Sequence, residues 1–159
     1  MCTINNFTFY KENNQIILPE YLDILQHGYK VFYQCIGKKL YLYIAKRPIP
    51  LKYELWNQED LLIVNLHLFN KKFALGFLEC YLDNYNDFNI RILNANVKRE
   101  GIGFYMILVL GYIADQLDIK EINLDDASNI LNYYKNIGCE YDEEGGSEMT
   151  CNVISINSH

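Results

Sequence analysis

The sequence predicts one α/β (α+β) domain, with a mixed, mostly antiparallel central sheet, flanking helices and one parallel βαβ crossover. Short β-rich runs separated by turn residues fill the chain up to residue 97. An apolar helical run follows at 103–117, and a short strand at 120–124 comes directly after it. A strand, a helix and a strand in this order form a right-handed crossover that makes the two strands parallel.

Composition supports a single folded domain over residues 1–159. Half of the residues are hydrophobic and 21% are charged, which is typical of a globular chain with a buried core. No linker, repeat or low-complexity segment divides the chain. The net charge of −6 argues against a general nucleic-acid binder, which needs Lys and Arg to neutralise phosphates.

The cysteines predict reduced thiols and a cytoplasmic location. They are Cys2, Cys35, Cys80, Cys139 and Cys151. Their number is odd and no C-x-x-C pair occurs, which argues against a zinc or redox site, and the three histidines are too scattered for a metal set. The N-terminus lacks a signal pattern, and the longest apolar run, 104–114, is too short to cross a bilayer. We therefore expect neither a metal nor a membrane partner.

The N-terminal part begins with a predicted helix and a hairpin. Pro19 suits the first turn of a helix that Gly28 would end. The β-rich runs 31–36 and 40–45 flank a short turn that starts at Gly37, which is a typical hairpin signal.

A break and a meander are predicted next. Pro48 and Pro50 interrupt the chain, and the polar segment 56–60 predicts a loop or a short helix. Three β-rich runs then follow, separated by short turns, and sequential strands of this kind are most often antiparallel neighbours. The runs are 61–69, 73–82 and 88–97.

The C-terminal part supplies the crossover and a final hairpin. The helix at 103–117 is apolar almost all round, so we expect it to be buried on more than one side. After the strand at 120–124, a second helix is predicted from about Asp125 to Ile137, with Gly138 as its C-terminal stop. The closing hairpin is expected to pair residues 139–142 with 149–156.

The junction between strand and helix, Lys98 to Gly103, has the features of an anion site. Gly101 and Gly103 let backbone amides approach a ligand closely, where the helix N-terminus already presents free N–H groups and a positive dipole end. A dinucleotide fingerprint is excluded because Met106 stands where the third glycine belongs, and no Walker lysine motif is present. The sequence therefore predicts a phosphate-bearing ligand of another kind.

Two segments together resemble the GCN5-related N-acetyltransferases (GNAT). The stretch 93–103 resembles the family's acetyl-coenzyme A motif, R/Q-x-x-G-x-G/A before an apolar helix, with Lys98 at the position of the Arg or Gln. The stretch 132–139 resembles its second motif, Y-x-x-x-G-F, and 119–124 resembles the intervening strand. Residues 61–159 would then form the coenzyme-binding core, and residues 1–60 a divergent acceptor-side part.

The resemblance implies acetyl-CoA as cosubstrate and assigns roles to individual residues. The amides from Arg99 to Phe104 would hold the pyrophosphate, and the backbone of Leu93 and Ala95 would bind the pantetheine arm. Tyr134 would protonate the leaving thiolate as general acid. The implied coenzyme-binding residues are Leu93, Ala95, Lys98, Arg99, Glu100, Gly101, Ile102, Gly103, Phe104 and Asn129.

The base that deprotonates the acceptor is open between Glu79, Asp87 and ordered water. The implied enzyme is an acyl-CoA-dependent N-acyltransferase that moves acetyl to an amine of a small molecule or a protein by direct attack, as a monomer or a homodimer. The alternative is a catalytically inactive coenzyme-sensing or interaction module. The divergent N-terminal half and Ala127, which stands where the family often has an Asn, support that alternative. Cys139 in place of the Phe and Ala95 in place of a Pro are further departures, which bear on the pantetheine contacts more than on the pyrophosphate site. Acetylation of aminoacyl-tRNA is disfavoured by the acidic balance.

Overall fold

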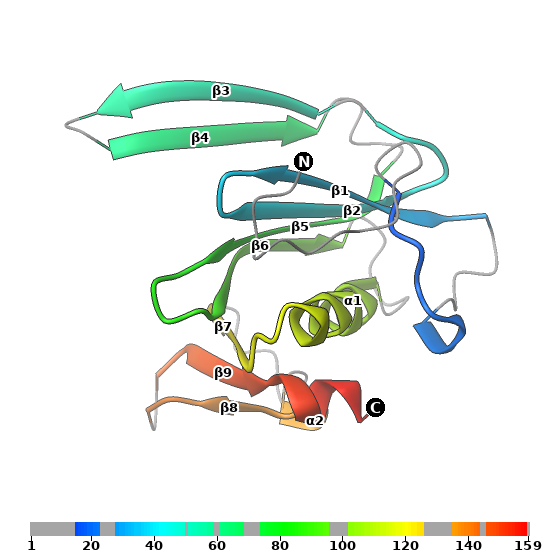
Figure 1. The fold of residues 1–159 in the computed structure, drawn as a ribbon, viewed down its shortest axis with the longest axis vertical. Coiled ribbons are helices and arrows are strands. Elements are labelled where there is room, and N and C mark those ends of the chain that lie inside the picture. The colour runs from blue at the N-terminus through cyan, green and yellow to red at the C-terminus, as the bar shows by residue number, and fades with distance from the viewer. Residues whose placement is uncertain are drawn as a thin grey trace.

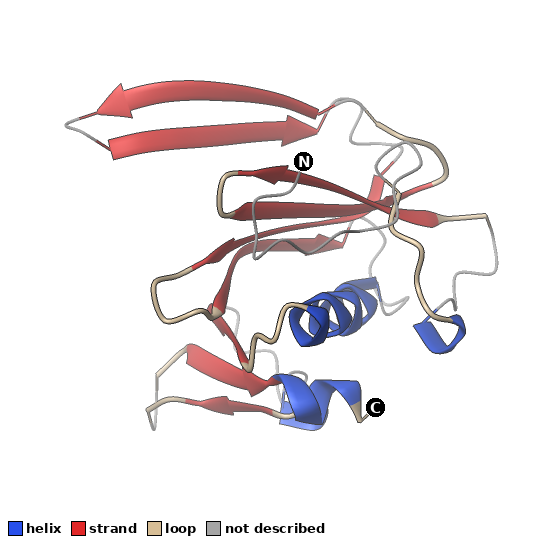
Figure 2. Cartoon of the chain, in the orientation of Figure 1, coloured by secondary structure: helices blue, strands red, loops and turns tan. Residues whose placement is uncertain are grey.

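The computed structural model describes residues 15–22, 28–49, 51–58, 61–68, 74–95, 102–125, 135–143 and 146–158. Its main feature is a seven-stranded sheet in the order β1-β2-β5-β6-β7-β9-β8 (Figures 1 and 2). The strands are β1 Lys30–Ile36, β2 Lys39–Ala45, β5 Ala74–Leu82, β6 Phe88–Ala95, β7 Glu121–Asp125, β8 Cys139–Tyr141 and β9 Glu148–Asn152. Among the described strands, β6 and β7 form the one parallel pair, so the predicted fold class is confirmed.

The β1–β2 hairpin agrees with its prediction. The two strands pair in register from Lys30↔Ala45 to Ile36↔Lys39, and Gly37 between them has a φ of 59°, which favours glycine. Because side chains alternate along a strand, Leu40, Leu42 and Ile44 of β2 enter the main core, whereas Tyr43 packs on the opposite face.

Two predictions for residues 51–69 are wrong. The segment 56–60 was expected to be a loop or a short helix, but Leu51–Gln58 is strand β3. It pairs antiparallel with β4, Leu61–Leu68, in a separate two-stranded sheet (Figure 1). The meander is therefore interrupted: β5 pairs with β2 and β6, and not with β4. The polar composition of the segment indicated a loop. Whether a segment forms a strand depends also on the strand with which it pairs, and the local sequence does not contain that information.

Helix α1, Ile102–Gln116, is buried on several sides, as predicted. Its apolar side chains share one core with strands on both sides of the β6–β7 pair, including Leu78 of β5 and Ile122 of β7. A second helix, α2 Val153–Asn157, approaches α1 at Gly111, where an added Cβ would lie 2.6 Å from Ile156 Cγ2. The glycine therefore permits the close contact of the two helices.

The last predicted strand is too long. Strand β9 ends at Asn152, and α2 follows where the hairpin was expected to continue to residue 156. Asn152 caps this helix, because its side chain accepts a hydrogen bond of 3.2 Å from the Ser155 N–H. The apolar Val153 and Ile156, which suggested a strand, are buried on one face of α2 instead.

Two predicted helices fall partly outside the described residues. The helix from Pro19 is represented by a 3-10 turn at Glu20–Leu22, and residues 23–27 lie outside the described ranges. The helix from Asp125 is represented by a 3-10 turn at Lys135–Ile137, and residues 126–134 also lie outside them. Gly138 has a φ of 96°, which suits its predicted role as a stop.

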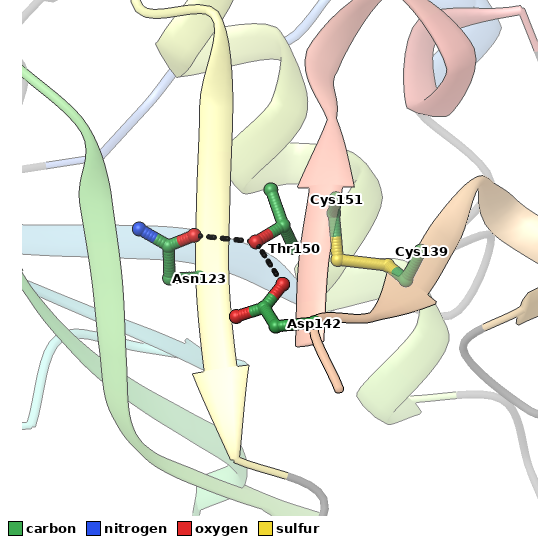
Figure 3. Close-up of a disulfide and its surroundings, with 5 residues drawn as sticks. All are labelled: Asn123, Cys139, Asp142, Thr150 and Cys151. Carbon is green, nitrogen blue, oxygen red and sulfur yellow. Dashed lines mark hydrogen bonds between the residues drawn. A yellow bond between two sulfur atoms is a disulfide. The ribbon is translucent and has the colours of Figure 1, made fainter. Parts of the chain in front are cut away.

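The prediction of reduced thiols is wrong for Cys139 and Cys151, which form a disulfide between β8 and β9 (Figure 3). The two residues are direct partners in the β8–β9 register, and this register is what brings them together. Cys35 is disulfide-bonded as well, whereas Cys80 is a free, buried thiol. Within the described ranges, no helix has the length and apolar character needed to cross a membrane.

The turn between β5 and β6 is organised by Asp83. Its Oδ1 accepts hydrogen bonds from the backbone N–H of Tyr85 at 2.9 Å and of Asp87 at 3.0 Å, and its Oδ2 accepts one from Asn89 Nδ2 at 2.7 Å. Burial alone would raise the pKa of Asp83, but these hydrogen bonds outweigh it and lower the pKa below 3.8. Asp87 shows the opposite: burial, then Asp83 and Glu121, raise its pKa.

We predict that Asp83→Asn destabilises the protein more at pH 7 than at pH 2. A lowered pKa means that the folded chain favours the carboxylate, so this stabilisation is present above 3.8 and is lost as the pH falls through the folded value. The variant should lose about 1 kcal/mol of unfolding free energy at pH 7, measured by urea denaturation. Asp87→Asn is the matched control and should be neutral or stabilising at pH 7. An equal loss for Asp83→Asn at both pH values would contradict the electrostatic explanation.

Candidate functional site

Of the predicted anion site, only the part on helix α1 lies within the described residues. Helix α1 begins at Ile102, so Ile102, Gly103 and Phe104 form its first turn, and a helix N-terminus directs backbone N–H groups out of the helix end. The first turn contains no acidic side chain that would compete with an anion for these groups. The loop residues Lys98, Arg99, Glu100 and Gly101 lie outside the described residues.

Strands β6 and β7 separate just before this helix. They pair at Phe88↔Ile122 and Asn89↔Asn123, and no further pair joins them, although β6 continues to Ala95 (Figure 1). The other edge of β6 stays paired with β5, with Leu93 opposite Leu78 and Ala95 opposite Gly76. Within the described ranges, no strand pairs with the β7-facing edge of β6 beyond Asn89. Backbone groups on that edge therefore face the opening.

A cavity of about 350 Å³ lies where the two strands separate. Residues 89–91 of β6 line one wall, and residues 123–125 at the end of β7 line the other. The β8–β9 hairpin extends the second wall through Asp142, Glu148 and Met149. A volume of this size suits a small molecule.

The second wall is held in place by hydrogen bonds beside the disulfide (Figure 3). The Thr150 hydroxyl lies 2.6 Å from Asp142 Oδ1 and 3.1 Å from Asn123 Oδ1. A hydroxyl carries one proton, and we assign it to the shorter, charge-assisted contact with Asp142. The Asp142 side chain, which follows β8, is thereby tied to β9.

The first wall contains an arginine backed by a buried carboxylate. Between Cys80↔Ile90 and Glu79↔Ile92, the β5–β6 register shifts, so Arg91 is the extra residue of a β-bulge. Its Nε lies 3.9 Å from Glu79 Oε2, and the side chains of Arg91 and Glu79 are 55% and 6% exposed. A bulge re-aims a side chain, and here it sets Arg91 at the cavity with Glu79 behind it.

Tyr41 is the cross-strand partner of Glu79 in β2 and is fully buried. Its hydroxyl makes no well-formed hydrogen bond within the described ranges. Burial raises the pKa of Tyr41 well above its usual value of 10.0, and the nearby Glu79 carboxylate raises it further. The Tyr41 hydroxyl therefore stays neutral at physiological pH.

The candidate catalytic residues do not lie together in the described part of the chain. Glu79 is in β5 and is 5% exposed, whereas Asp87 lies in the turn before β6. Tyr134 and Asn129 lie outside the described residues. Of the coenzyme-binding residues, Leu93 and Ala95 lie on β6 and the residues from Ile102 to Phe104 lie at the start of α1, at the two sides of the loop.

Sequence reasoning missed the charged residues of the cavity. Arg91 stands alone among apolar neighbours in a predicted strand, and that isolation was an available signal. Asp125 was interpreted as part of a helix start, but it ends β7 directly opposite Glu148 of β9. Only the strand register, which no local pattern reveals, brings these two carboxylates together.

We predict an energetic coupling between Glu79 and Arg91. Arg91→Met should cost about 1–3 kcal/mol of unfolding free energy, because it leaves the buried carboxylate without its cation. The double variant Glu79→Gln/Arg91→Met should recover most of that loss. Urea denaturation of the wild type, both single variants and the double variant gives the coupling energy. If the losses of unfolding free energy in the two single variants simply add in the double variant, the 3.9 Å contact contributes nothing to stability.

The sequence matches no protein-family model, and no curated protein is significantly similar to it. Solved structures do resemble the chain. A GNAT family acetyltransferase from Elizabethkingia anophelis with acetyl-CoA bound aligns with a TM-score of 0.50 and 9% identity, over 80% of this chain and 99% of that one.

Two further structures align with lower TM-scores. Tetrahymena GCN5 gives a TM-score of 0.47 at 12% identity, over 74% of this chain and 70% of its own.

 PaiA N-acetyltransferase from Thermoplasma acidophilum, in complex with coenzyme A, gives a TM-score of 0.43 at 22% identity, over 55% of this chain. That alignment spans 58% of the Thermoplasma protein.

The alignment with the Elizabethkingia structure extends over most of this chain and nearly all of that protein. The protein therefore has the fold of the GCN5-related N-acetyltransferases.

Proposed function

We propose that the protein is an acetyltransferase that moves the acetyl group of acetyl-CoA to an amine by direct attack. The observation that carries this proposal is the opening between β6 and β7, which leads from the start of α1 to the cavity. In the Elizabethkingia protein, a similar fold holds acetyl-CoA. Residues 61–159 would form the coenzyme-binding core.

The described residues fit a coenzyme A at this opening. The first turn of α1 contains no acidic side chain, and the positive dipole end of a helix N-terminus suits a pyrophosphate. The unpaired edge of β6 offers backbone groups to the amides of a pantetheine arm, as a neighbouring strand would use them. From Ala95 back to Arg91 this edge spans about 14 Å, at roughly 3.4 Å per residue. It ends at the cavity, where an acceptor has room.

The reaction needs few groups from the protein. Acetyl-CoA supplies an activated thioester, whose carbonyl carbon the acceptor nitrogen attacks while the C–S bond breaks. Tyr134 would donate its phenolic proton to the departing sulfur, and the amine would lose one proton to a base. Glu79 and Asp87 remain the candidate bases, and the burial of Glu79 behind Arg91 requires that a water carry the proton to it.

The first prediction concerns coenzyme binding. Titration calorimetry with acetyl-CoA should show saturable binding to the wild type, and Gly103→Glu should abolish it through steric and charge conflict with the pyrophosphate. A glutamate in the first turn of a helix favours the helix dipole, so the variant should stay folded.

Ile154→Glu is the matched control, because it adds the same charge on an exposed position of α2 and should bind acetyl-CoA normally. If Gly103→Glu binds as tightly as the wild type, Gly103 is not part of the site. If the wild type shows neither heat nor a shift in melting temperature at millimolar acetyl-CoA, the proposed function fails.

The second prediction concerns the general acid. Tyr134→Phe should lower kcat roughly a hundredfold while leaving the Kd for acetyl-CoA within about twofold, because the phenol would act on the leaving group. Tyr133→Phe is the neighbouring control and should retain its kcat. The assay is release of the free thiol with an amine panel. An unchanged kcat for Tyr134→Phe would leave that residue a packing role.

A folded wild type that binds acetyl-CoA but releases no thiol with any amine would instead identify an inactive coenzyme-sensing module. The binding and release measurements thus separate the two readings of the same fold.

A further inference from the structure

The cavity between β6 and β7 carries opposite charges on its two walls. Arg91 lies on the β6 wall, and Asp125, Asp142 and Glu148 lie on the wall formed by β7 and the β8–β9 hairpin. Within the described ranges, no ion pair joins the two walls. A ligand between them meets a cation on one side and carboxylates on the other.

The carboxylate wall contains a pair that is unfavourable in the free protein. Asp125 and Glu148 are direct cross-strand partners in β7 and β9, and like charges in such positions repel each other. The described residues give neither side chain a cationic partner. An ammonium group in the cavity would relieve this repulsion.

These carboxylates do not form a metal site. Within the described residues, no group of three or more carboxylate, His or Cys side chains is close enough to hold a metal ion. Asp142 is also engaged by the Thr150 hydroxyl. An organic ammonium, which needs no such tight ligand set, is the better match to the wall.

On the β6 wall, the guanidinium of Arg91 is placed to bind an anion. The buried carboxylate of Glu79, with a side chain 6% exposed, faces the Nε edge of Arg91 at 3.9 Å. No other described residue forms an ion pair with the guanidinium, so its two terminal nitrogens remain for a ligand carboxylate, which Arg binds in a bidentate way.

The rest of the lining is mixed: Ile90, Leu124 and Met149 supply apolar surface, and Tyr81, Asn89 and Asn123 carry polar groups. The cavity thus combines a cation, a pair of carboxylates and an apolar surface within about 350 Å³. An α-amino acid carries three complementary groups on one carbon: a carboxylate, an ammonium and a side chain.

We propose that this cavity binds an aliphatic α-amino acid, with its carboxylate at Arg91, its ammonium at Asp125 and Glu148, and its side chain against Ile90, Leu124 and Met149. If the protein is an acetyltransferase, as proposed above, this amino acid is its acceptor. Binding to the cavity itself does not depend on that activity.

Leucine and two analogues test the proposal by titration calorimetry on the full chain, with and without coenzyme A. Isoamylamine lacks only the carboxylate of leucine, and 4-methylpentanoate lacks only the ammonium. Leucine should bind saturably, and each analogue should bind at least tenfold more weakly, because each leaves one charged wall without its partner.

Two pairs of substitutions assign the walls. Asp125→Asn/Glu148→Gln should weaken leucine at least tenfold, leave 4-methylpentanoate unaffected and raise the melting temperature of the free protein, because the cross-strand repulsion is removed. Glu79→Gln/Arg91→Met, chosen because it leaves no buried charge unpaired, should weaken leucine and leave isoamylamine unaffected. The melting temperatures show that each variant is folded.

The outcomes separate this proposal from the proposed function. Equal binding of leucine and isoamylamine, tighter binding of spermidine than of leucine, or no binding of any probe would overturn the amino-acid site. Leucine binding without acetyl-CoA binding would support the site and refute the acetyltransferase. Acetyl-CoA binding with thiol release for other amines, but no leucine binding, would do the reverse.

Discussion

Burial of helix α1 is the constraint on which the rest of the structure depends. The helix is apolar almost all round, so one flat face of a sheet cannot cover it. Its core includes Leu78 from the first part of the sheet, Ile122 from β7, Cys151 from β9 and Ile156 from α2. A sheet that surrounds a helix in this way must bend between its two parts. The bend falls at β6 and β7, where the pairing stops after two positions, so the opening is a consequence of the core.

What the sequence could predict depends on whether a feature is set by neighbouring residues or by residues far along the chain. Gly37, the apolar run of α1 and the strand that follows it are local signals, so the first hairpin and the crossover were predicted correctly. The β3–β4 sheet and the Cys139–Cys151 disulfide depend on which segments pair, and residues far along the chain decide that. The candidate site divides likewise. The start of α1 was predicted from glycines, but the bulge at Arg91 and the Asp125–Glu148 pair exist only in the register.

Charged and polar groups whose arrangement opposes folding lie around the opening. Glu79 is buried with one long contact to a cation, and the Tyr41 hydroxyl beside it lacks a well-formed hydrogen bond within the described ranges. Asp125 and Glu148 repel each other across two strands. Each arrangement lowers stability, whereas the main core is formed by buried hydrophobic residues. Local rules are usually broken where a protein has a function, because a ligand supplies the missing partner.

The wall formed by β8 and β9 would be too short to hold its shape by strand pairing alone. Strand β8 has three residues, and its partner β9 has five. The disulfide, the contact between Thr150 and Asp142, and the α2 helix capped by Asn152 fix this hairpin from three directions. A wall fixed in advance loses little conformational entropy when a ligand binds, which favours affinity in a small cavity. The disulfide that the sequence did not predict therefore stabilises the side of the cavity on which the carboxylates lie.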